Sequence, residues 1–591
     1  MNSNSLKKES KSYIISALPV IFLVSVFLFA VHAVIVKTGL EGTFWYGNNE
    51  YTVDVYSYFR MQIFIAVAVI SIVYLVISVL SGSAKVYKNK VYIPMIIYAL
   101  MTFISYMAAD YKHMAAVGFF ERYENTFVLI GYMAITFYAM NMINDERAFK
   151  LIFYIFSGCC AVLGIWGVLQ TFEIDLYSLP SWLYMNSEIS QMSNLKISGA
   201  ADSVRWFFTN QNYSSFFMIF PICVSAMLII WNKKVQWKIA FTVLLALMFY
   251  SLFNAKSLGG MVGVACSALA GLIVFNKKLI EWKTSVVLII IAGIVSAAVS
   301  LPSIMGEISS VTPVASLFSK TAYADDIQQE GLKYVDIDYV ITDGNNIIFN
   351  FSGTEVTIKT ENGRVLGVYG ADGSEIGLNT DYMQVSEGEL EYTEYKTVNV
   401  KTANATWKFA DLDGELYFVT SSGKGAKLDK VESFGFENSQ DFATYRGYIW
   451  SRTLPLIKDT ILIGHGADTF AMYFPQADYA GKYNIGYFND STNIIVDKPH
   501  NMYLGMAVNT GVISLIAALC IFGFYLVDSF KIYRKNEYSG FISFMGGGVF
   551  VAVCGFLVAG LVNDSTVQIM PIFYALLGTG FAANRILKEK K

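Results

Sequence analysis

Long apolar runs recur along most of this 591-residue chain, and they restrict its fold more than any other feature. A helix that crosses the hydrocarbon core of a bilayer needs about 18 or more mostly apolar residues. The chain is 55% hydrophobic and only 15% charged, a balance that is rare in a soluble protein of this size. We therefore predict an all-α polytopic membrane protein with about twelve transmembrane helices. The expected spans are 13–36, 61–81, 91–109, 126–142, 150–172, 213–231, 238–255, 258–276, 284–304, 502–527, 541–562 and 566–585.

Lys and Arg residues in the short connections predict how these helices are oriented. If the N-terminus lies inside, every inner connection is basic, from Lys7 and Lys8 before the first span to Lys588 after the last. Such an excess marks the cytoplasmic side of a membrane protein. The basic head and first apolar run lack a small-residue cleavage site, so we expect a retained span. Both termini are thus predicted to be cytoplasmic, and the long polar stretch 305–500 lies outside.

The six cysteines all fall within apolar segments. The polar regions therefore offer neither a disulfide framework nor a Cys-x-x-Cys metal site. A large exported region without disulfides is more typical of a bacterial cell surface than of a eukaryotic one. We predict a multi-pass protein of the bacterial cytoplasmic membrane.

The chain divides into four predicted parts. Residues 1–304 hold helices one to nine, and 305–437 form an extracytoplasmic β-rich insert between helices nine and ten. Residues 438–500 form extracytoplasmic interfacial helices with the candidate active-site residues, and 501–591 hold helices ten to twelve and the cytoplasmic C-terminus. The insert is predicted from alternating apolar and polar residues around turn dipeptides, Asn362-Gly363 and Asp413-Gly414, each expected to close a hairpin.

The helix predicted after the insert is aromatic and basic. Phe442, Tyr445, Ile449 and Leu456 would fall on one face at helical spacing, with basic residues on either side of that stripe. Such a helix is expected to lie on the outer leaflet, with its guanidinium groups at headgroup depth.

Several basic residues fall on the outer side, against the general bias. Each residue alone has an ordinary structural explanation. A Lys near the membrane surface can extend its charged end into water, and an exported domain ordinarily carries surface Arg residues. Together they predict an anion site at the outer leaflet, since the planar fork of Arg meets phosphate oxygens two at a time. These residues are Arg205, Lys256, Arg446, Arg452 and Lys498.

His500 stands where the chain enters the predicted tenth span. On position alone, burial or interface anchoring is its ordinary interpretation. The pairs Asp336/Asp338 and Asp411/Asp413 have the spacing that some metal-dependent glycosyltransferases use. In hairpins, solvated strand and turn residues are the better interpretation, so no metal site and no cofactor are predicted.

Two successive segments read "YRGYIWSRTLPLIKDTILIGHGADTF" and "KPHNMYLGMAVNTGVISLIAAL". They hold an Arg before a Trp, a Gly-x-Gly turn, and a His-Asn pair entering a span that contains a Gly. In this order they resemble the signature of the O-antigen ligase and O-antigen polymerase superfamily. The residues that fill its places are Arg446, Trp450, Gly464, Gly466, His500, Asn501 and Gly511.

An earlier segment, "RWFFTNQNYSSFF", resembles the part of that family in which an Asn precedes a span, here Asn212. The family usually carries a Ser-Arg pair between its seventh and eighth spans. This chain has "AKSLGG" there, with Leu258 after Ser257, so Lys256 would have to supply the charge. The β-rich domain looks like an insertion, and the resemblance assigns it no role.

The resemblance implies a membrane glycosyltransferase that uses a lipid-pyrophosphate-linked glycan donor of the undecaprenyl type. The acceptor would be a hydroxyl of a glycan, wall polymer or protein, and transfer would be metal-independent and inverting. The residues independently allow such chemistry. Preorganised positive charge stabilises a departing pyrophosphate. An imidazole, with a reference pKa of about 6.5, can accept the proton of the acceptor hydroxyl. The expected catalytic residues are His500 and Arg446. The expected substrate-binding residues are Arg205, Lys256, Arg452, Asn501 and Asn212.

Two other classes of function are compatible with the composition. A transporter or flippase of polysaccharide precursors would place ionisable residues and broken helices at mid-membrane. A surface sensor or scaffold would display the β-rich insert without needing Lys256 or His500 where they lie. Within the enzyme hypothesis, polymerase and ligase stay open, as do the sugar, the linkage, the acceptor and the oligomeric state.

Overall fold

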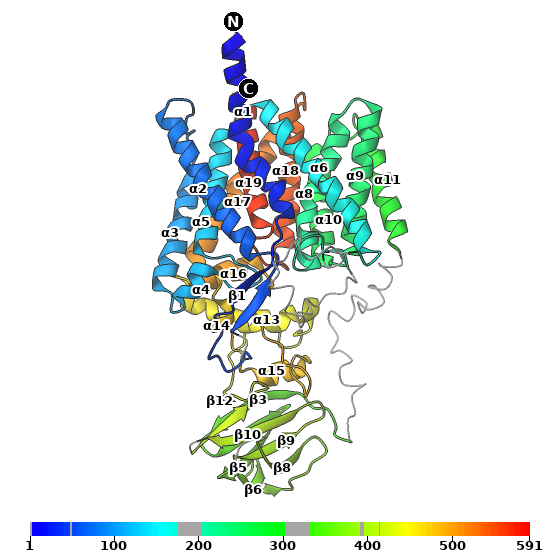
Figure 1. The fold of residues 1–591 in the computed structure, drawn as a ribbon. Helices are drawn as coiled ribbons and strands as arrows, with labels where there is room; N and C mark the ends of the chain where they lie inside the picture. Colours follow the sequence, from blue (N-terminus) through cyan, green and yellow to red (C-terminus); the bar gives the residue numbers. More distant parts are fainter. Residues whose placement is uncertain are drawn as a thin grey trace.

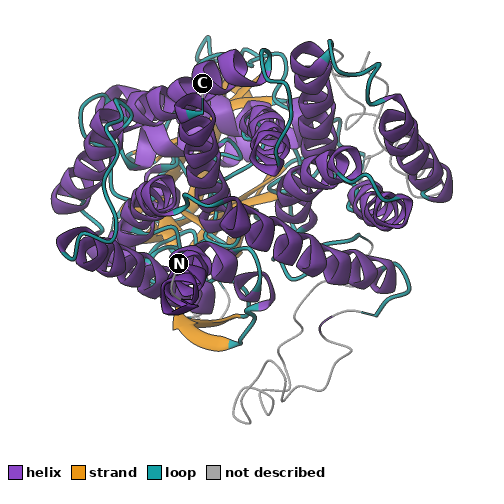
Figure 2. Ribbon diagram, turned by 90° about the horizontal axis from the view of Figure 1, so that it is seen from above, coloured by secondary structure: helices purple, strands orange, loops and turns teal. Residues whose placement is uncertain are grey.

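The computed structural model describes residues 3–47, 50–174, 176, 203–301, 331–390, 395–412 and 414–590. These residues form a helical bundle at one end and a β-rich unit at the other, with short helices between them (Figure 1). Both chain termini lie at the end of the bundle away from the β-rich unit (Figure 1). Viewed from the end that carries the termini, the helices stand side by side with the strands behind them (Figure 2).

The bundle is built from long apolar helices that correspond to the predicted spans. They are α1 (Ser3–Leu23), α2 (Tyr58–Leu80), α3 (Tyr92–Ala108), α5 (Thr126–Met142), α6 (Glu146–Gln170), α8 (Gln211–Trp231), α9 (Val235–Asn254), α10 (Leu258–Phe275), α11 (Lys283–Val299), α17 (Val512–Tyr533), α18 (Phe541–Ala559) and α19 (Met570–Glu589). Among the described residues, seven helices are long and apolar enough to cross a membrane: α2, α6, α8, α9, α10, α17 and α18. The prediction of a mainly helical, multi-pass membrane protein is confirmed, whereas the count of twelve spans stays a prediction.

The first predicted span, 13–36, is shorter as a helix than expected. Helix α1 ends at Leu23, and after a short 3-10 turn strand β1 (Val34–Lys37) pairs with β2 (Tyr51–Asp54). The buried guanidinium of Arg60 donates to the carbonyls of Phe27 and Leu28 at 3.2 and 2.8 Å. These bonds supply donors to carbonyls that would otherwise lack a hydrogen-bond partner in apolar surroundings after the helix ends.

The tenth predicted span, 502–527, is two helices, α16 (Met502–Asn509) and α17. The break lies at Gly511, whose φ of 93° suits glycine. Gly464 packs against this break so closely that a Cβ atom there would collide with the backbone of Asn509 and Gly511. His465 and Gly466 donate backbone hydrogen bonds to Val508 and Asn509. The glycines of the motif thus fix the entrance of this span.

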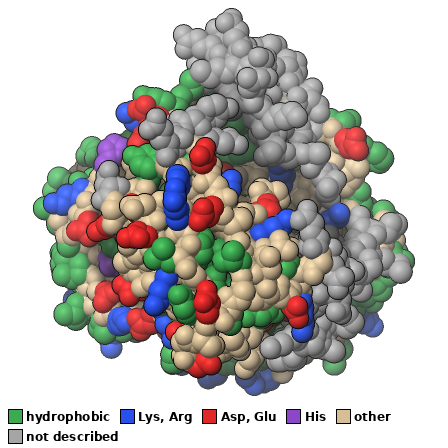
Figure 3. Space-filling model, turned by 90° about the horizontal axis from the view of Figure 1, so that it is seen from below, with side chains coloured by type: hydrophobic (Ala, Val, Ile, Leu, Met, Phe, Trp, Pro, Cys, Tyr) green, Lys and Arg blue, Asp and Glu red, His purple; other side chains and the backbone are tan. Residues whose placement is uncertain are grey.

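The β-rich unit consists of two antiparallel five-stranded sheets. One contains β3 (Ile337–Asp343), β4 (Asn346–Phe351), β5 (Thr354–Glu361), β6 (Arg364–Gly370) and β7 (Glu375–Ile376) in that order. The other contains β8 (Gln384–Glu389), β9 (Lys396–Lys401), β10 (Thr406–Leu412), β11 (Glu415–Val419) and β12 (Gly425–Ala426). Acidic and basic side chains are interspersed over the described surface at this end (Figure 3).

Both predicted hairpins form. Glu361 pairs with Arg364 across Asn362-Gly363, whose φ angles of 50° and 69° suit a tight hairpin turn. Leu412 pairs with Glu415 in the second hairpin. Residue Asp413 of that turn and residues 305–330 of the predicted insert lie outside the described residues.

Short helices connect the β-rich unit to the bundle: α13 (Phe442–Leu456), α14 (Phe470–Tyr473) and α15 (Tyr479–Asn484). Tyr479, Tyr483 and Phe488 enter the core of the β-rich unit, where Phe488 lies 5.0 Å from the ring of Trp407. The β-rich unit is therefore packed onto the same segment that leads to His500.

Candidate active site

His500 occupies a left-handed backbone conformation, with φ 51°, directly before α16. Non-glycine residues adopt this conformation rarely and at an energetic cost, so its surroundings must hold it. The indole of Trp450 in α13 donates to the carbonyl of Pro499 at 2.8 Å. Asn501 is buried and caps α16, accepting two backbone N–H groups of its first turn at 2.9 and 3.1 Å. Both neighbours of His500 are thus anchored.

Asp564, in the connection between α18 and α19, is the partner of His500. Its Oδ2 lies 2.8 Å from His500 Nδ1, and the carboxylate is buried while 32% of the imidazole is exposed. Burial would raise the pKa of Asp564, but the paired imidazole of His500 and the charges of Lys498 and Arg122 outweigh burial and hold that pKa at about 2. A carboxylate only accepts hydrogen bonds, so Nδ1 carries the proton and Nε2 of a neutral ring is left as the basic atom.

Arg446 follows a left-handed turn inside α13. Ala443, Thr444 and Tyr445 have φ angles of 51°, 61° and 63°, and Arg446 Nη1 donates back to the Ala443 carbonyl at 2.6 Å. The predicted apolar stripe that includes Phe442 is therefore wrong as a continuous helical face. Burial lowers the pKa of Arg446, and the nearby carboxylate of Asp564 opposes this shift. Arg446 and the His500–Asp564 pair thus share one electrostatic environment.

Lys498 adds a second cation to this environment. Its ammonium lies 3.1 Å from Asp497 Oδ2, and its side chain is only 11% exposed. Burial would lower the pKa of Lys498, but the surrounding acidic groups Asp497, Tyr213, Asp564 and Glu121 raise it above its ordinary value. The lysine is therefore charged at neutral pH.

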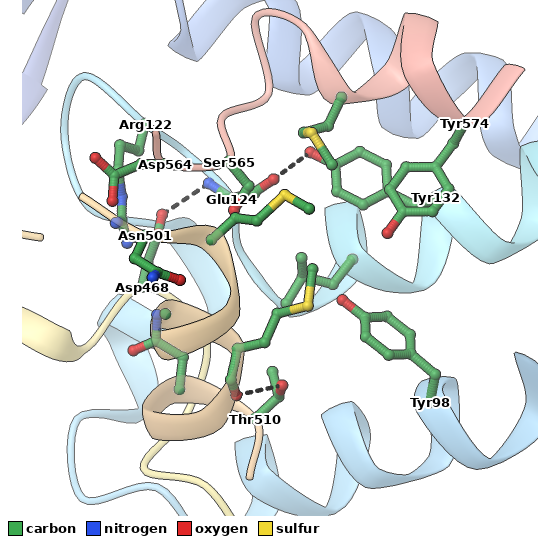
Figure 4. Close-up of a pocket in the computed structure, with 16 residues that line it drawn as sticks. Tyr98, Arg122, Glu124, Tyr132, Asp468, Asn501, Thr510, Asp564, Ser565 and Tyr574 are labelled. Carbon is green, nitrogen blue, oxygen red and sulfur yellow. Dashed lines mark hydrogen bonds and ion pairs between the residues drawn. The ribbon is translucent and has the colours of Figure 1, made fainter. Parts of the chain in front are cut away.

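A buried ion pair between Arg122 and Asp468 lies beside Asn501 and Asp564, and all four side chains line one cavity (Figure 4). The guanidinium of Arg122 contacts Asp468, which also accepts the backbone N–H groups of Phe119 at 3.0 Å and Glu124 at 2.7 Å. Burial would lower the pKa of Arg122, but Asp468 and Asp564 raise it above its ordinary range. The loop between α4 (Lys112–Val117) and α5 is thus tied to the segment before α14.

Arg205 and Lys256 lie on neighbouring segments. The residue before Arg205, Val204, donates a backbone hydrogen bond at 2.9 Å to Asn254 at the end of α9. Both charged side chains are half-buried. The segments that carry Arg205 and Lys256 are therefore joined by a backbone hydrogen bond, and a joint phosphate site stays a prediction.

Asn212 belongs to the first turn of α8, where its Oδ1 accepts the hydroxyl of Ser257 at 2.9 Å. Gly259, at the start of α10, packs against the side chain of Asn563. Because Asn563 precedes Asp564, the segment with Lys256 and Ser257 reaches the connection that holds the imidazole partner.

Arg452 occupies a different environment. Its Nε donates to Asp478 Oδ2 at 2.8 Å and its Nη1 to Ser451 Oγ at 2.9 Å. The guanidinium also lies over the ring of Tyr448, 4.5 Å from the centroid. These contacts tie α13 to the cap of α15, and Arg452 is 9% exposed.

One aspartate of each acidic pair in the β-rich unit accepts a backbone N–H at a turn, whereas Asp413 lies outside the described residues. Asp338 accepts the backbone N–H of Gly353 at 2.8 Å, and Asp411 accepts that of Gly414 at 2.9 Å. Within the part of the chain that the structure describes, no three His, Cys, Asp or Glu side chains converge as metal ligands would.

The stretch that joins Arg446, Trp450 and His500 is also the one that comparison with known families selects. Residues 409–519 match the family model for O-antigen ligase. The match confirms the resemblance to the O-antigen ligase superfamily, and it runs from β10 into α17. It therefore includes the imidazole and ends before Asp564. No match was found among the curated proteins or the solved structures.

Proposed function

We propose that the protein is a membrane glycosyltransferase that transfers or polymerises a lipid-pyrophosphate-linked glycan of the undecaprenyl type. The acceptor is a hydroxyl of a glycan, wall polymer or protein. The observation that carries this proposal is the hydrogen-bonded His500–Asp564 pair beside Arg446, within and next to the segment that matches O-antigen ligase.

In the proposed reaction, Nε2 of His500 takes the proton of the acceptor hydroxyl as its oxygen attacks the anomeric carbon. A new carbon–oxygen bond forms, and the bond to the lipid pyrophosphate breaks with its electron pair on the departing oxygen. Attack from the face opposite the leaving group inverts the anomeric centre. Arg446, Arg205 and Lys256 stabilise the pyrophosphate charge without requiring a metal.

We infer that this site faces outward. The basic connections predict cytoplasmic termini, and the site lies at the opposite end of the bundle, next to the β-rich unit (Figure 1). Residues 305–437 would then be extracytoplasmic, as would the interfacial segment 438–500. The same placement supports an enzyme over a transporter, whose coupling charges belong at mid-membrane.

A reconstituted assay tests the proposal. Purified protein in nanodiscs, supplied with a lipid-linked glycan and an acceptor, should form the new glycosidic bond, and His500→Ala should slow its formation about 10²–10⁴-fold. Movement of the lipid-linked glycan across a vesicle membrane without bond formation would instead support the transporter hypothesis.

A further inference from the structure

A second buried carboxylate, Glu124, lies beside the connection that carries Asp564 (Figure 4). One of its oxygens accepts the hydroxyl of Ser565, the residue after Asp564. The other accepts the hydroxyl of Tyr132 in α5 at 2.8 Å. The side chain is almost fully buried, and it has no part in the proposed transfer reaction.

The surroundings of Glu124 make its charge sensitive to pH near neutrality. Burial raises the pKa of Glu124 to about 7, and the hydrogen bonds from Ser565 and Tyr132 only partly oppose this shift. The adjacent cavity of about 20 Å³ has room for about one water molecule. The titratable and charged groups that face Glu124 or line this cavity are Asp468, Arg122, Tyr98, Tyr132, Tyr574 and Asp564.

We propose that Glu124 is a positioning residue of the His500–Asp564 pair, which acts through Ser565 and works best when it is ionised. The inference rests on the proposed function. A carboxylate accepts both hydroxyl groups at once, whereas a protonated carboxyl group turns one of its oxygens into a donor. Protonation therefore weakens the hold on Ser565. Because Ser565 follows Asp564 directly, the carboxylate that orients the imidazole loses alignment with it.

The test compares wild type with Glu124→Gln, since glutamine copies the shape of the protonated carboxyl group. The ratio of their kcat values should lie near one at acidic pH and rise through about pH 7 to about tenfold, the effect expected from a lost hydrogen bond to a charged acceptor. Both proteins keep His500, Asp564 and Ser565, so the ratio reports the change at residue 124. A ratio that is flat between about pH 5.5 and about pH 8.5 overturns the proposal.

Two further variants separate positioning from folding. Ser565→Ala removes the same hydrogen bond from the other side, so it should lower kcat about as much, and the double variant should add little. Tyr132→Phe is the matched control, because it removes the other hydroxyl from Glu124 and keeps Ser565. Its kcat should stay within about twofold of wild type when it is measured at about pH 8.5, where Glu124 is ionised. Additive losses, or an equal loss in Tyr132→Phe, contradict action through Ser565.

A readout without catalysis distinguishes this inference from the proposed function. The rate at which diethyl pyrocarbonate modifies His500 should differ between wild type and Glu124→Gln above about pH 7 and converge below it. If no protein transfers glycan but this difference is present, the positioning role stands and the proposed function fails. If transfer is normal, and Glu124→Gln changes neither kcat nor the modification rate of His500 at any pH, the positioning role is wrong and the proposed function stands.

Discussion

The Nδ1 atom of His500 lies 2.8 Å from Oδ2 of Asp564, so the imidazole is held by a buried carboxylate from a different connection between helices. Carboxylate pairing fixes the tautomer and orientation of a general base and stabilises the imidazolium that forms when it takes a proton. This relationship supports the proposed role of His500 as a general base over that of an interfacial residue at the head of a span.

Substitutions in this pair should separate catalysis from folding. His500→Ala is expected to insert normally and bind the lipid donor, yet to lose about 10²–10⁴-fold in kcat, the usual effect of removing a general base. Asp564→Asn should also lower kcat strongly with little change in donor KM, because an amide can hold the ring in the wrong tautomer. The measurement is steady-state transfer in nanodiscs.

Asn584→Ala, in the distant part of α19, is a suitable control. Asn584 is buried, and its side-chain amide donates to the hydroxyl of Ser529 at 2.8 Å. The substitution should change stability more than kcat. Near-normal transfer by well-folded His500→Ala would restore the interfacial interpretation.

Arg446 should contribute to donor binding as well as to turnover. Arg446→Ala is expected to raise the donor KM and lower kcat, because the proposed contact of Arg446 with phosphate would be made in both the ground and the transition state. Arg446→Lys should recover only part of the loss, since an ammonium ion cannot make the two-pronged contact. Donor binding and single-turnover rates provide the measurement.

Arg452→Lys is the matched comparison on the same helix. Its ion pair with Asp478 is buried, so this substitution should lower the melting temperature more than it changes donor KM. A large rise in donor KM at unchanged stability would instead favour Arg452 as a phosphate ligand.

The sequence predicted much of the fold because apolar runs and turn dipeptides are local signals. The helical spans and the Asn362-Gly363 hairpin follow directly from such signals. Asp564 was not predicted, although it is the only charged residue between Glu537 and Arg585, because nothing local assigns it to His500. The left-handed turn before Arg446 was missed for a similar reason, since tertiary contacts override helical spacing there.

Glu124 should leave a signature in the pH dependence of stability. Its folded-state pKa is raised from 4.5 to about 7, so its contribution to stability is full below about pH 4.5 and is lost as pH rises through about 7. Glutamine does not titrate. The melting temperature of Glu124→Gln relative to wild type should therefore increase from about pH 5 to about pH 8. The exposed Glu415→Gln is the control and should give a flat difference, whereas a flat difference for Glu124→Gln would contradict the raised pKa.

The orientation of the bundle is testable with introduced cysteines. Ser421, in the turn between β11 and β12, and Ser83, between α2 and α3, are both exposed. The first belongs to the β-rich unit, and the second to a connection at the end of the bundle that carries the termini (Figure 1). Ser421→Cys should react with an impermeant maleimide on intact cells, and Ser83→Cys only after permeabilisation. The parent protein with its six native cysteines sets the background. The reverse pattern would place His500 inside and remove the basis for an outward-facing site.

The β-rich unit is expected to be an accessory module and not the catalytic centre, because Asp338 and Asp411 of its acidic pairs accept backbone N–H groups at turns. Replacing residues 331–434 with a flexible linker should leave transfer above the level of His500→Ala, with altered acceptor preference. The truncation uncovers Tyr479, Tyr483 and Phe488, so its melting temperature should fall, and changing these three residues to Ser in the same truncation should limit aggregation. Transfer should be equally insensitive to EDTA in both proteins. Complete loss of transfer in a folded, membrane-inserted truncation would show that the β-rich unit is part of the catalytic machinery.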